Sequence, residues 1–228
     1  MNTAKYGRTY HYPFSPGTTS DDRIQYDYWH AVQAMPALLH TEKLDGENNC
    51  LNSYGVFARS HAAPTSSPWT SAIRQRWDIL KHDLGDLEIF GENLYAIHSI
   101  EYQRLEHHYF VFAIRCQDMW LSWEEVAFYA AAFDLPTVPV LVRKADFSSE
   151  SSFKSDVIAL AGAPSVFDSY DIQTGQACSR EGVVSRNAAA FSVDALGTNV
   201  FKYVRKGHVK TDEHWTRHWK RAPLVSER

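Results

Sequence analysis

Two short apolar segments on either side of a glycine-containing turn constrain the fold of this chain more than any other feature. Residues 37–44 enter the segment Thr-Glu-Lys-Leu-Asp-Gly-Glu-Asn, and residues 51–60 have the composition of a strand that returns from it. Such a pattern is typical of neighbouring strands joined through a turn. The sequence therefore predicts antiparallel strands at this point.

Helix and strand signals alternate irregularly along the rest of the chain. Pro68 follows Ser67 at a predicted helix start, where a proline leaves no amide hydrogen unpaired, and apolar residues continue at spacings of three or four as far as Leu84. Ser122 and Glu125 form a capping-box pattern before a second helix. Hairpin-like connections between the segments favour an α+β fold with antiparallel sheets. Further helices are predicted at about 27–34 and at 152–161, and strands at 87–95, 108–114, 137–142, 181–186 and 199–205.

Length and composition fit a single soluble domain, or one domain with a small appendage. The 228 residues are enough to bury a substantial core. No apolar run is long enough to cross a bilayer, and the polar N-terminus, broken by prolines, does not resemble a secretory signal. The three cysteines lie far apart and form no CxxC pair, which favours reduced thiols in a cytoplasmic protein.

Positive charge gathers near the C-terminal end, although the formal net charge of the chain is −4. In this stretch the acidic residues are Asp212 and Glu213, and the basic residues are Lys202, Arg205, Lys206, Lys210, Arg217, Lys220 and Arg221. The contrast predicts either a phosphate-binding surface for nucleic acid or a solvated tail. The charges alone leave both interpretations open.

Lys43 is the candidate for covalent chemistry, in the segment Lys43-Leu44-Asp45-Gly46. A lysine amine becomes a nucleophile when burial, neighbouring cations or a metal lower its pKa. The glycine lets the backbone turn closely against a ligand. Because this short pattern alone is weakly specific, the alternative is an exposed lysine in a polar hairpin turn.

The segments that follow Lys43 come in a fixed order. They are Ala58-Arg59-Ser60, Phe90-Gly91-Glu92-Asn93-Leu94, Tyr109-Phe110-Val111-Phe112, Glu181-Gly182-Val183-Val184-Ser185-Arg186 and Phe201-Lys202-Tyr203-Val204-Arg205. With this series the sequence resembles the covalent nucleotidyltransferase superfamily of polynucleotide ligases and mRNA capping enzymes, and within it the ATP-dependent RNA ligases. The first residues and the segment after Val204 are also similar to a compact bacterial and phage group of RNA ligases.

The resemblance implies a role for each matching residue. Lys43 matches the motif I lysine, which attacks the α-phosphate of ATP, expels pyrophosphate and keeps AMP. Asp45 matches an aspartate that helps the later, nucleic-acid steps; a turn-forming aspartate is the alternative. Glu92 matches the motif III carboxylate that binds the ribose hydroxyls.

Further nucleotide contacts are implied for Glu42, Arg59 and Phe112. Arg59 would contact AMP or the 5′-phosphate, which suits a planar guanidinium donor, unless it is a surface arginine. Phe112 resembles the aromatic residue that stacks on adenine. Its alternatives are a role in the core of a central strand, and Phe110 as the stacking ring.

Motifs IV and V supply the remaining site residues. Glu181 matches a carboxylate associated with the divalent metal, and Lys202 matches the first motif V lysine near the α-phosphate. Where many RNA ligases have a second lysine, this chain has Val204. Arg205 or Lys206 could supply the missing charge, although neighbouring side chains on a strand point to opposite faces. Nucleic-acid contacts are predicted for Arg205, Lys206, Arg217, Lys220 and Arg221.

The resemblance also implies an α+β nucleotidyltransferase domain, with two antiparallel sheets, flanking helices and a nucleotide groove between the sheets. We expect this ligase adenylation domain at residues 1–206, including the N-terminal lead-in, and a short basic extension at 207–228. About 25 residues follow motif V, too few for a five-stranded OB-fold domain. The sequence predicts a minimal catalytic unit without an OB-fold domain.

The implied activity is that of an RNA ligase joining 3′-hydroxyl and 5′-phosphate ends in three steps. ATP adenylylates Lys43, AMP passes to the 5′-phosphate, and the 3′-hydroxyl then displaces AMP. Mg²⁺ or Mn²⁺ would neutralise phosphate charge, and the expected partners are ATP and RNA ends or a nicked duplex. The alternatives are a DNA nick or broad-specificity polynucleotide ligase, and a non-catalytic module that binds nucleotide or RNA.

Overall fold

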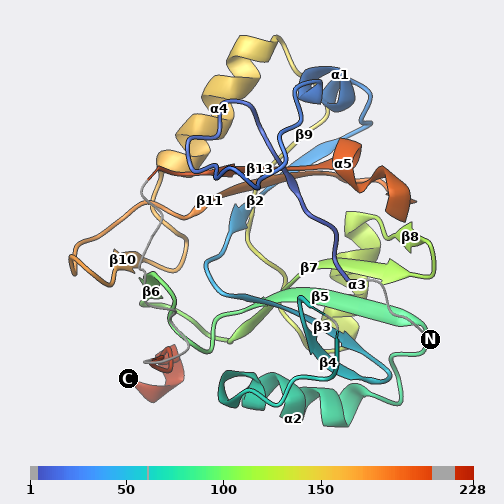
Figure 1. Cartoon of the computed structure of the whole chain (residues 1–228), viewed down its shortest axis with the longest axis vertical. Helices are drawn as coiled ribbons and strands as arrows, with labels where there is room; N and C mark the ends of the chain where they lie inside the picture. Colours follow the sequence, from blue (N-terminus) through green and yellow to red (C-terminus); the bar gives the residue numbers. More distant parts are fainter. Residues whose placement is uncertain (1–4, 61, 207–218) are drawn as a thin grey trace.

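The computed structural model describes residues 5–60, 62–206 and 219–228, and two larger sheets dominate this part of the chain (Figure 1). Neighbouring strands are antiparallel except β1 and β13, which run parallel, so the predicted α+β fold with antiparallel sheets is confirmed. The first sheet has the order β1 (Tyr10–His11), β13 (Val200–Val204), β11 (Gly182–Asn187), β2 (Leu38–Lys43) and β9 (Val140–Lys144). The second has the order β12 (Phe191–Ser192), β8 (Met119–Trp120), β7 (Tyr109–Cys116), β5 (Leu87–Asn93), β3 (Glu47–Asn52) and β4 (Gly55–Ala58), and β6 (Ile100–Tyr102) pairs separately with β10 (Ser169–Asp171).

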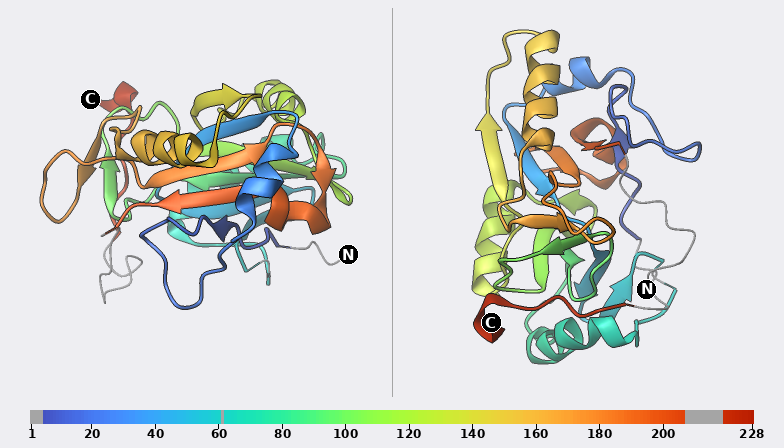
Figure 2. Two further views of the ribbon diagram at one scale, coloured as in Figure 1. Left: turned by 90° about the horizontal axis from the view of Figure 1, so that it is seen from above. Right: turned by 90° about the vertical axis from the view of Figure 1, so that its left-hand side faces the viewer.

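Helices cover the outer faces of both sheets. The helices α1 (Tyr28–Gln33) and α4 (Glu150–Gly162) lie over the first sheet, whereas α2 (Ser71–Leu80) and α3 (Trp123–Ala132) lie against the second (Figure 1, Figure 2). The predicted capping box is confirmed, because Ser122 Oγ accepts a hydrogen bond from the Glu125 amide and the Glu125 carboxylate accepts one from the Ser122 amide. The proline start is confirmed as a 3-10 turn, Pro68–Thr70, that leads into α2. A short helix, α5 (Leu196–Asn199), precedes β13.

The strands on either side of the Gly46 turn do not pair with each other as predicted, because β2 belongs to the first sheet and β3 to the second. Two further strand predictions are wrong in their bounds. Residues 51–60 contain a turn between β3 and β4, where the Asn52 side-chain oxygen accepts a hydrogen bond from the Tyr54 amide and stabilises the reversal. The strand predicted at 137–142 starts later, because Pro139 has no amide to pair. The Val111 amide of the second sheet donates to the Pro136 carbonyl, and the Val138 amide donates to the Val111 carbonyl, so this segment passes from one sheet to the other.

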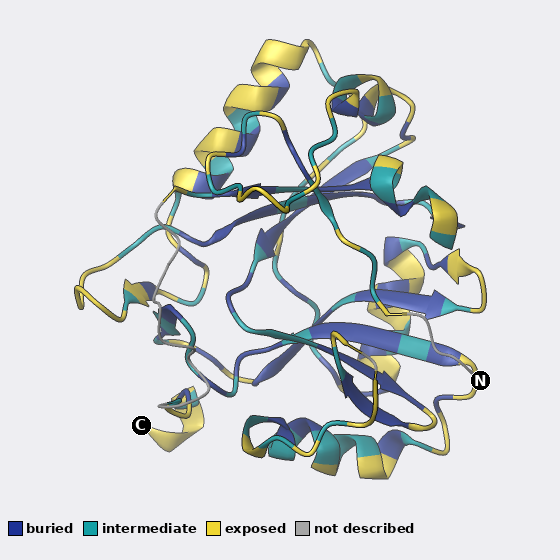
Figure 3. Cartoon of the chain, in the orientation of Figure 1, coloured by how far each residue is buried: buried dark blue, intermediate teal, exposed yellow. Residues whose placement is uncertain are grey.

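The described residues form three apolar clusters, and the buried strands lie between more exposed helices (Figure 3). One cluster packs the first sheet against α1 and α4, and another packs the second sheet against α2 and α3. A third joins the two sheets, since Phe90 and Trp120 of the second sheet pack with Leu196 and Val200. This third cluster borders the cavity described below.

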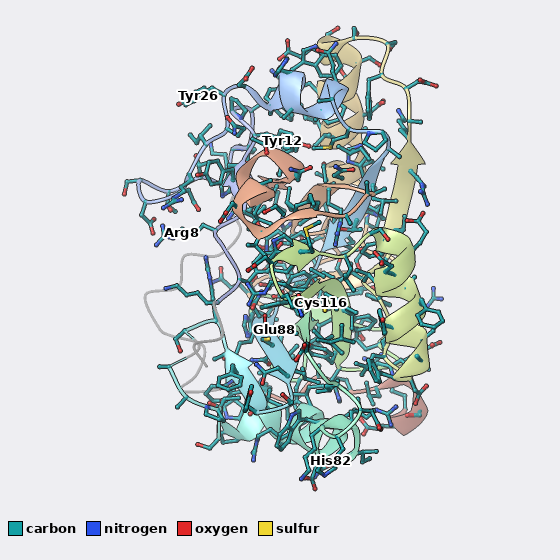
Figure 4. All side chains as sticks on the ribbon, turned by 90° about the vertical axis from the view of Figure 1, so that its right-hand side faces the viewer. Arg8, Tyr12, Tyr26, His82, Glu88 and Cys116 are labelled. Carbon is teal, nitrogen blue, oxygen red and sulfur yellow. The ribbon has the colours of Figure 1, made fainter. Side chains whose placement is uncertain are left out.

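The N-terminal lead-in, residues 5–27, runs from the second sheet to the first (Figure 1). The Tyr6 ring packs on Trp120 with the ring centres 5.1 Å apart, and β1 then adds to the first sheet. Tyr12 of the lead-in is buried in the core, whereas Arg8 and Tyr26 lie on the outside of the molecule (Figure 4). The lead-in thus connects both sheets.

The C-terminal residues 219–228 pack against the connection between β5 and β6. The Ile97 amide donates to the Lys220 carbonyl at 2.9 Å, and the Ala222 amide donates to the Tyr95 carbonyl at 2.8 Å. The predicted boundary between residues 206 and 207 adjoins residues outside the described part, so it stays a prediction. Within the described residues, no helix has the length and apolar character needed to span a membrane.

Candidate active site

A cavity of about 600 Å³ lies between the two sheets, a size typical of small-molecule sites. Strands β2, β11 and β13 contribute residues from one sheet, and β3, β5 and β7 contribute residues from the other. The groove predicted between the two sheets is therefore present as this cavity. Of the residues predicted to serve nucleotide or catalysis, those that line it are Glu42, Lys43, Arg59, Glu92, Phe112 and Lys202.

Lys43 ends β2, opposite Gly182 of β11, and is held there by Glu181. Both Glu181 carboxylate oxygens lie 2.6 Å from Lys43 Nζ, and Glu181 is buried and is not among the residues that line the cavity. Burial lowers the pKa of Lys43, but the charges of Glu181 and Glu92 outweigh burial and raise it above the ordinary value. The amine is therefore a cation in this structure, and it must lose a proton before it can act as a nucleophile.

Glu92 reaches the same region from β5 of the second sheet. Its Oε1 accepts a hydrogen bond from the Gly46 amide at 3.1 Å. Gly46 permits this contact, because a Cβ atom there would lie 2.4 Å from the Asn93 carbonyl oxygen. The sequence predicts that the Gly46 backbone turns closely against a ligand, whereas in the structure it packs closely against β5. Burial raises the pKa of Glu92 to about 8, although the charge of Lys43 lowers it.

Asp45 is directed to the protein interior and is not among the residues that line the cavity. Its Oδ2 accepts hydrogen bonds from the Ser99 amide at 2.9 Å, the Ser99 hydroxyl at 2.5 Å and the Ile100 amide at 2.9 Å. The Asp45 amide donates to the Tyr102 hydroxyl. In this structure Asp45 fastens the turn after Lys43 to β6, and its predicted role in the nucleic-acid steps stays a prediction.

We expect Asp45→Ala to lower the free energy of unfolding by about 3 kcal/mol, because it removes the acceptor of three buried hydrogen bonds from Ser99 and Ile100. Asp45→Asn should cost less, since its side-chain oxygen can occupy the Oδ2 position. Urea denaturation of both variants measures the difference. Equal stability losses in the two variants would contradict this interpretation, and a folded Asp45→Asn variant that fails only in sealing would identify a catalytic role.

Lys202 lies on the same wall as Lys43, two strands away. It is opposite Val184 of β11, which is opposite Thr41 of β2, and all three side chains line the cavity. Burial and the charge of Lys43 lower the pKa of Lys202. The cavity therefore brings two cations close together on one sheet.

Phe112 is placed at the cavity by an irregularity of β7. Phe90 pairs with Ala113 but Gly91 pairs with Val111, so Phe112 is the extra residue of a β-bulge. Bulges redirect side chains, and Phe112 lines the cavity. Phe110 instead packs on Phe167 in the core, with the ring centres 5.0 Å apart. The geometry favours Phe112 over Phe110 as the stacking ring.

Arg59 and Glu42 border the cavity in different ways. Arg59 follows β4 at an exposed position. The Glu42 carboxylate is engaged elsewhere, because Oε2 accepts a hydrogen bond from the Val166 amide at 3.1 Å and lies 3.9 Å from Arg180 Nε. Alternation along β2 directs Glu42 to the face opposite Lys43. Nucleotide contacts by Arg59 and Glu42 stay predictions.

Several cavity residues were not identified from the sequence. Asn48 lies on β3 opposite Glu92. It follows Lys43 by five residues, and this short spacing could have identified it from the sequence. Arg186 donates to the carbonyls of Phe112 and Leu121, at 2.9 and 3.0 Å, and thereby ties β11 to the bulge of the second sheet. No pattern in the neighbouring sequence marks the lead-in residues that line the cavity, because only the fold brings them there. They are Tyr6, Gly7 and Thr9.

The residues predicted to contact nucleic acid that the structure describes do not line the cavity. Lys206 and Lys220 are exposed, and Arg205 is half-buried, its amide bonded to the Glu181 carbonyl. Arg221 pairs with Glu227 and lies over the Tyr95 ring, so binding phosphate would require opening this pair. Arg217 lies outside the described residues. These contacts stay predictions.

The model of the RNA ligase family matches residues 37–204. The chain belongs to the RNA ligase family. This match contains Lys43, Glu92, Glu181 and Lys202, whereas the lead-in precedes it. No curated protein matches the sequence.

Solved RNA ligases are similar in fold to this family member. A ligand-free variant of Naegleria gruberi RNA ligase is 18% identical, with a TM-score of 0.53 over 85% of this chain and 57% of that chain. Another variant of that protein, with ATP and Mn, is 17% identical, with a TM-score of 0.53 over 91% and 60%. An archaeal ATP-dependent RNA ligase is 17% identical, with a TM-score of 0.48 over 76% and 44%. This chain thus spans less than two thirds of the length of these proteins.

Proposed function

We propose that this chain is an ATP-dependent ligase that joins 3′-hydroxyl and 5′-phosphate ends of RNA through AMP bound to Lys43. The observation that carries the proposal is the meeting of Lys43, Glu92 and Lys202 at one cavity, with Glu181 on the Lys43 amine. Membership of the RNA ligase family supports RNA as the substrate. The Naegleria gruberi structure with ATP and Mn supports ATP and a divalent metal as the first ligands to test.

In the first step, the neutral Lys43 amine forms a bond to the α-phosphorus of ATP, and the bond to pyrophosphate breaks. The amine must release its proton to solvent before the attack, so the Lys43–Glu181 ion pair has to open. Lys202 faces the same cavity and would stabilise the negative charge on the α-phosphate. Glu92 would bind the ribose hydroxyls, and Phe112 would stack on adenine.

The residues at the site fit a divalent metal that takes much of its coordination from phosphate and water. Glu181 and Glu92 supply carboxylates near Lys43, but among the described residues no group of three or more potential protein ligands forms a metal site. Mg²⁺ and Mn²⁺ prefer oxygen ligands, and Mg²⁺ usually retains several waters. Glu181 would hold the ion, which would supply charge to neutralise the phosphates.

Intact mass spectrometry tests the covalent step. Incubation with ATP and Mg²⁺ or Mn²⁺ should add one AMP to the protein, and excess chelator should prevent the addition. With ATP labelled at the α- or the γ-phosphate, only the α-label should remain on the protein. An unmodified protein, or retention of the γ-label, would contradict the proposal.

A substrate panel tests the polynucleotide class. Single-stranded RNA ends, nicked RNA duplexes and nicked DNA duplexes, each with a 5′-phosphate, should be offered at equal concentrations. We expect sealing of at least one RNA substrate, with an adenylylated 5′-end as the transient species. Sealing restricted to the DNA nick would replace RNA ligase by the alternative of a DNA nick ligase.

A further inference from the structure

The lead-in brings a carboxylate to the second cavity lysine. Asp22 Oδ1 lies 3.5 Å from Lys202 Nζ, and both side chains are about three quarters buried, with exposed fractions of 25% and 22%. Asp22 precedes residues 37–204, the region that the family model matches. The contact is therefore made by a segment outside the part of the chain that carries the family motifs.

Asp22 is held in place from two sides. Its Oδ2 accepts a hydrogen bond from the Thr19 amide at 3.0 Å and lies 2.9 Å from the Thr19 hydroxyl, which also contacts Asp21 Oδ1 at 2.6 Å. Its Oδ1 lies 3.2 Å from His11 Nε2, and His11 is the direct β1 neighbour of Lys202 on β13. Because the carboxylate is fixed within the fold, it can fix the position of the lysine that it contacts.

His11 contacts the first sheet on its other side. Ser15 Oγ lies 2.9 Å from His11 Nδ1, accepts a hydrogen bond from the Val204 amide and donates one to the Val204 carbonyl at 3.5 Å. Burial, with the charge of Lys202, lowers the pKa of His11 to about 4, so the ring is neutral near pH 7.

Lys202 needs such a partner because of its surroundings. The charged groups that act on it are Lys43 of β2, Glu181 before β11 and Asp22 of the lead-in. Lys43 repels the Lys202 cation and is itself paired with Glu181. Without Asp22, the Lys202 amine would lose its nearest counter-charge and could turn away from the cavity or lose its proton.

We propose that Asp22 is a positioning residue of the adenylylation site that acts through Lys202. It holds the Lys202 amine as a cation on the cavity wall until the α-phosphate of ATP replaces it as the partner. The inference rests on the proposed function, because the group that replaces Asp22 as the partner of Lys202 is the α-phosphate of the proposed substrate ATP. It also gives the lead-in a part in the chemistry.

The test compares Asp22→Asn with Asp21→Asn. Asparagine keeps the size of Asp22 and an acceptor for Thr19 but removes the charge. Asp21 lies in the same turn, where it pairs with Arg8 at an exposed position, so it controls for a change of charge in the lead-in. The single-turnover rate of AMP attachment at saturating ATP should fall about tenfold in Asp22→Asn, the loss expected for one charged hydrogen bond. Asp21→Asn should stay within about twofold of the unmodified protein, and Asp22→Glu should recover part of the rate.

The pH profile separates positioning from a general loss of structure. Asp22 raises the pKa of Lys202, so removing the charge lowers that pKa further. At high pH, where Lys202 loses its proton, the rate should therefore decline at a lower pH in Asp22→Asn than in Asp21→Asn. Thermal melts of both variants should match that of the unmodified protein.

Amine labelling tests the contact without relying on activity. A water-soluble N-hydroxysuccinimide ester, read out by peptide mass spectrometry, should label Lys202 several-fold faster in Asp22→Asn than in Asp21→Asn, because more of the amine is neutral. Unchanged Lys202 labelling, or an unchanged rate of AMP attachment in Asp22→Asn, would overturn the inference. If the unmodified protein never acquires AMP, the proposed function fails, while the labelling result still decides whether Asp22 controls Lys202.

Discussion

Lys43→Met is expected to abolish the attachment of AMP, with a fall of at least about a thousandfold in the rate. Lys43 is the amine next to the carboxylates of both sheets, whereas Lys202 is held by Asp22 on a neighbouring part of the wall. The substitution removes the amine to which we assign the nucleophilic attack. Intact mass after incubation with ATP and Mn²⁺, followed by peptide mapping of the unmodified protein, measures the effect.

Lys43→Arg is the matched control for this variant. Methionine removes the cation that contacts the buried Glu181 carboxylate, which can lower stability. Arginine retains a cation for Glu181, but its guanidinium stays protonated and does not attack phosphorus. We expect both variants to be inactive and Lys43→Arg to melt at a temperature closer to that of the unmodified protein. AMP on either variant, or AMP mapped to Lys202, would show that the nucleophile is wrongly assigned.

The second large effect is expected for Glu181→Gln, which should slow AMP attachment by about a hundredfold or more. Glu181 is buried and contacts the Lys43 amine through both oxygens, so its charge orients the nucleophile in the free protein. Its loss also removes the carboxylate that we assign to the metal. Single-turnover rates over a range of Mg²⁺ and Mn²⁺ concentrations should show that the variant needs more metal.

Glu124→Gln provides the control for a carboxylate removed from an ion pair elsewhere. Glu124 pairs with Arg143 at an exposed position on α3, at 2.5 Å. Exposed pairs of this kind contribute little to stability, so the Glu124 variant should retain normal rates. If Glu181→Gln kept a normal rate and a normal metal requirement, neither the orienting role nor the metal assignment would survive.

Patterns confined to a few neighbouring residues predicted a large share of the fold. The capping box at Ser122 and the proline start at Pro68 involve contacts within one turn of the chain, so the sequence contains them in readable form. The ordered motifs also located Lys43, Glu92 and Lys202, which the fold then brings to one cavity. The bounds of the irregular strands could not be predicted in the same way, because they depend on pairing partners from other segments.

Side-chain partners from distant segments could not be predicted in this way. Asp45 reads as a catalytic or turn-forming aspartate, yet its carboxylate bonds to Ser99 only because the turn packs on β6. The choice between Phe112 and Phe110 depends on a bulge that arises from the register of β5 and β7. The sequence predicts a nucleic-acid contact for Arg221, whereas the folded C-terminal residues place its guanidinium against Glu227.

The parallel pairing of β1 with β13 bears on the order in which the site is assembled during synthesis. Tyr10 leaves the ribosome early, but its partner Phe201 is made after every other described strand. Closing so long a loop is entropically costly and slows folding. A nascent or prematurely terminated chain can therefore contain Lys43 and yet lack the β13 lysine and the anchored lead-in. Such a chain has only part of the cavity wall that the complete protein forms from β2, β11 and β13.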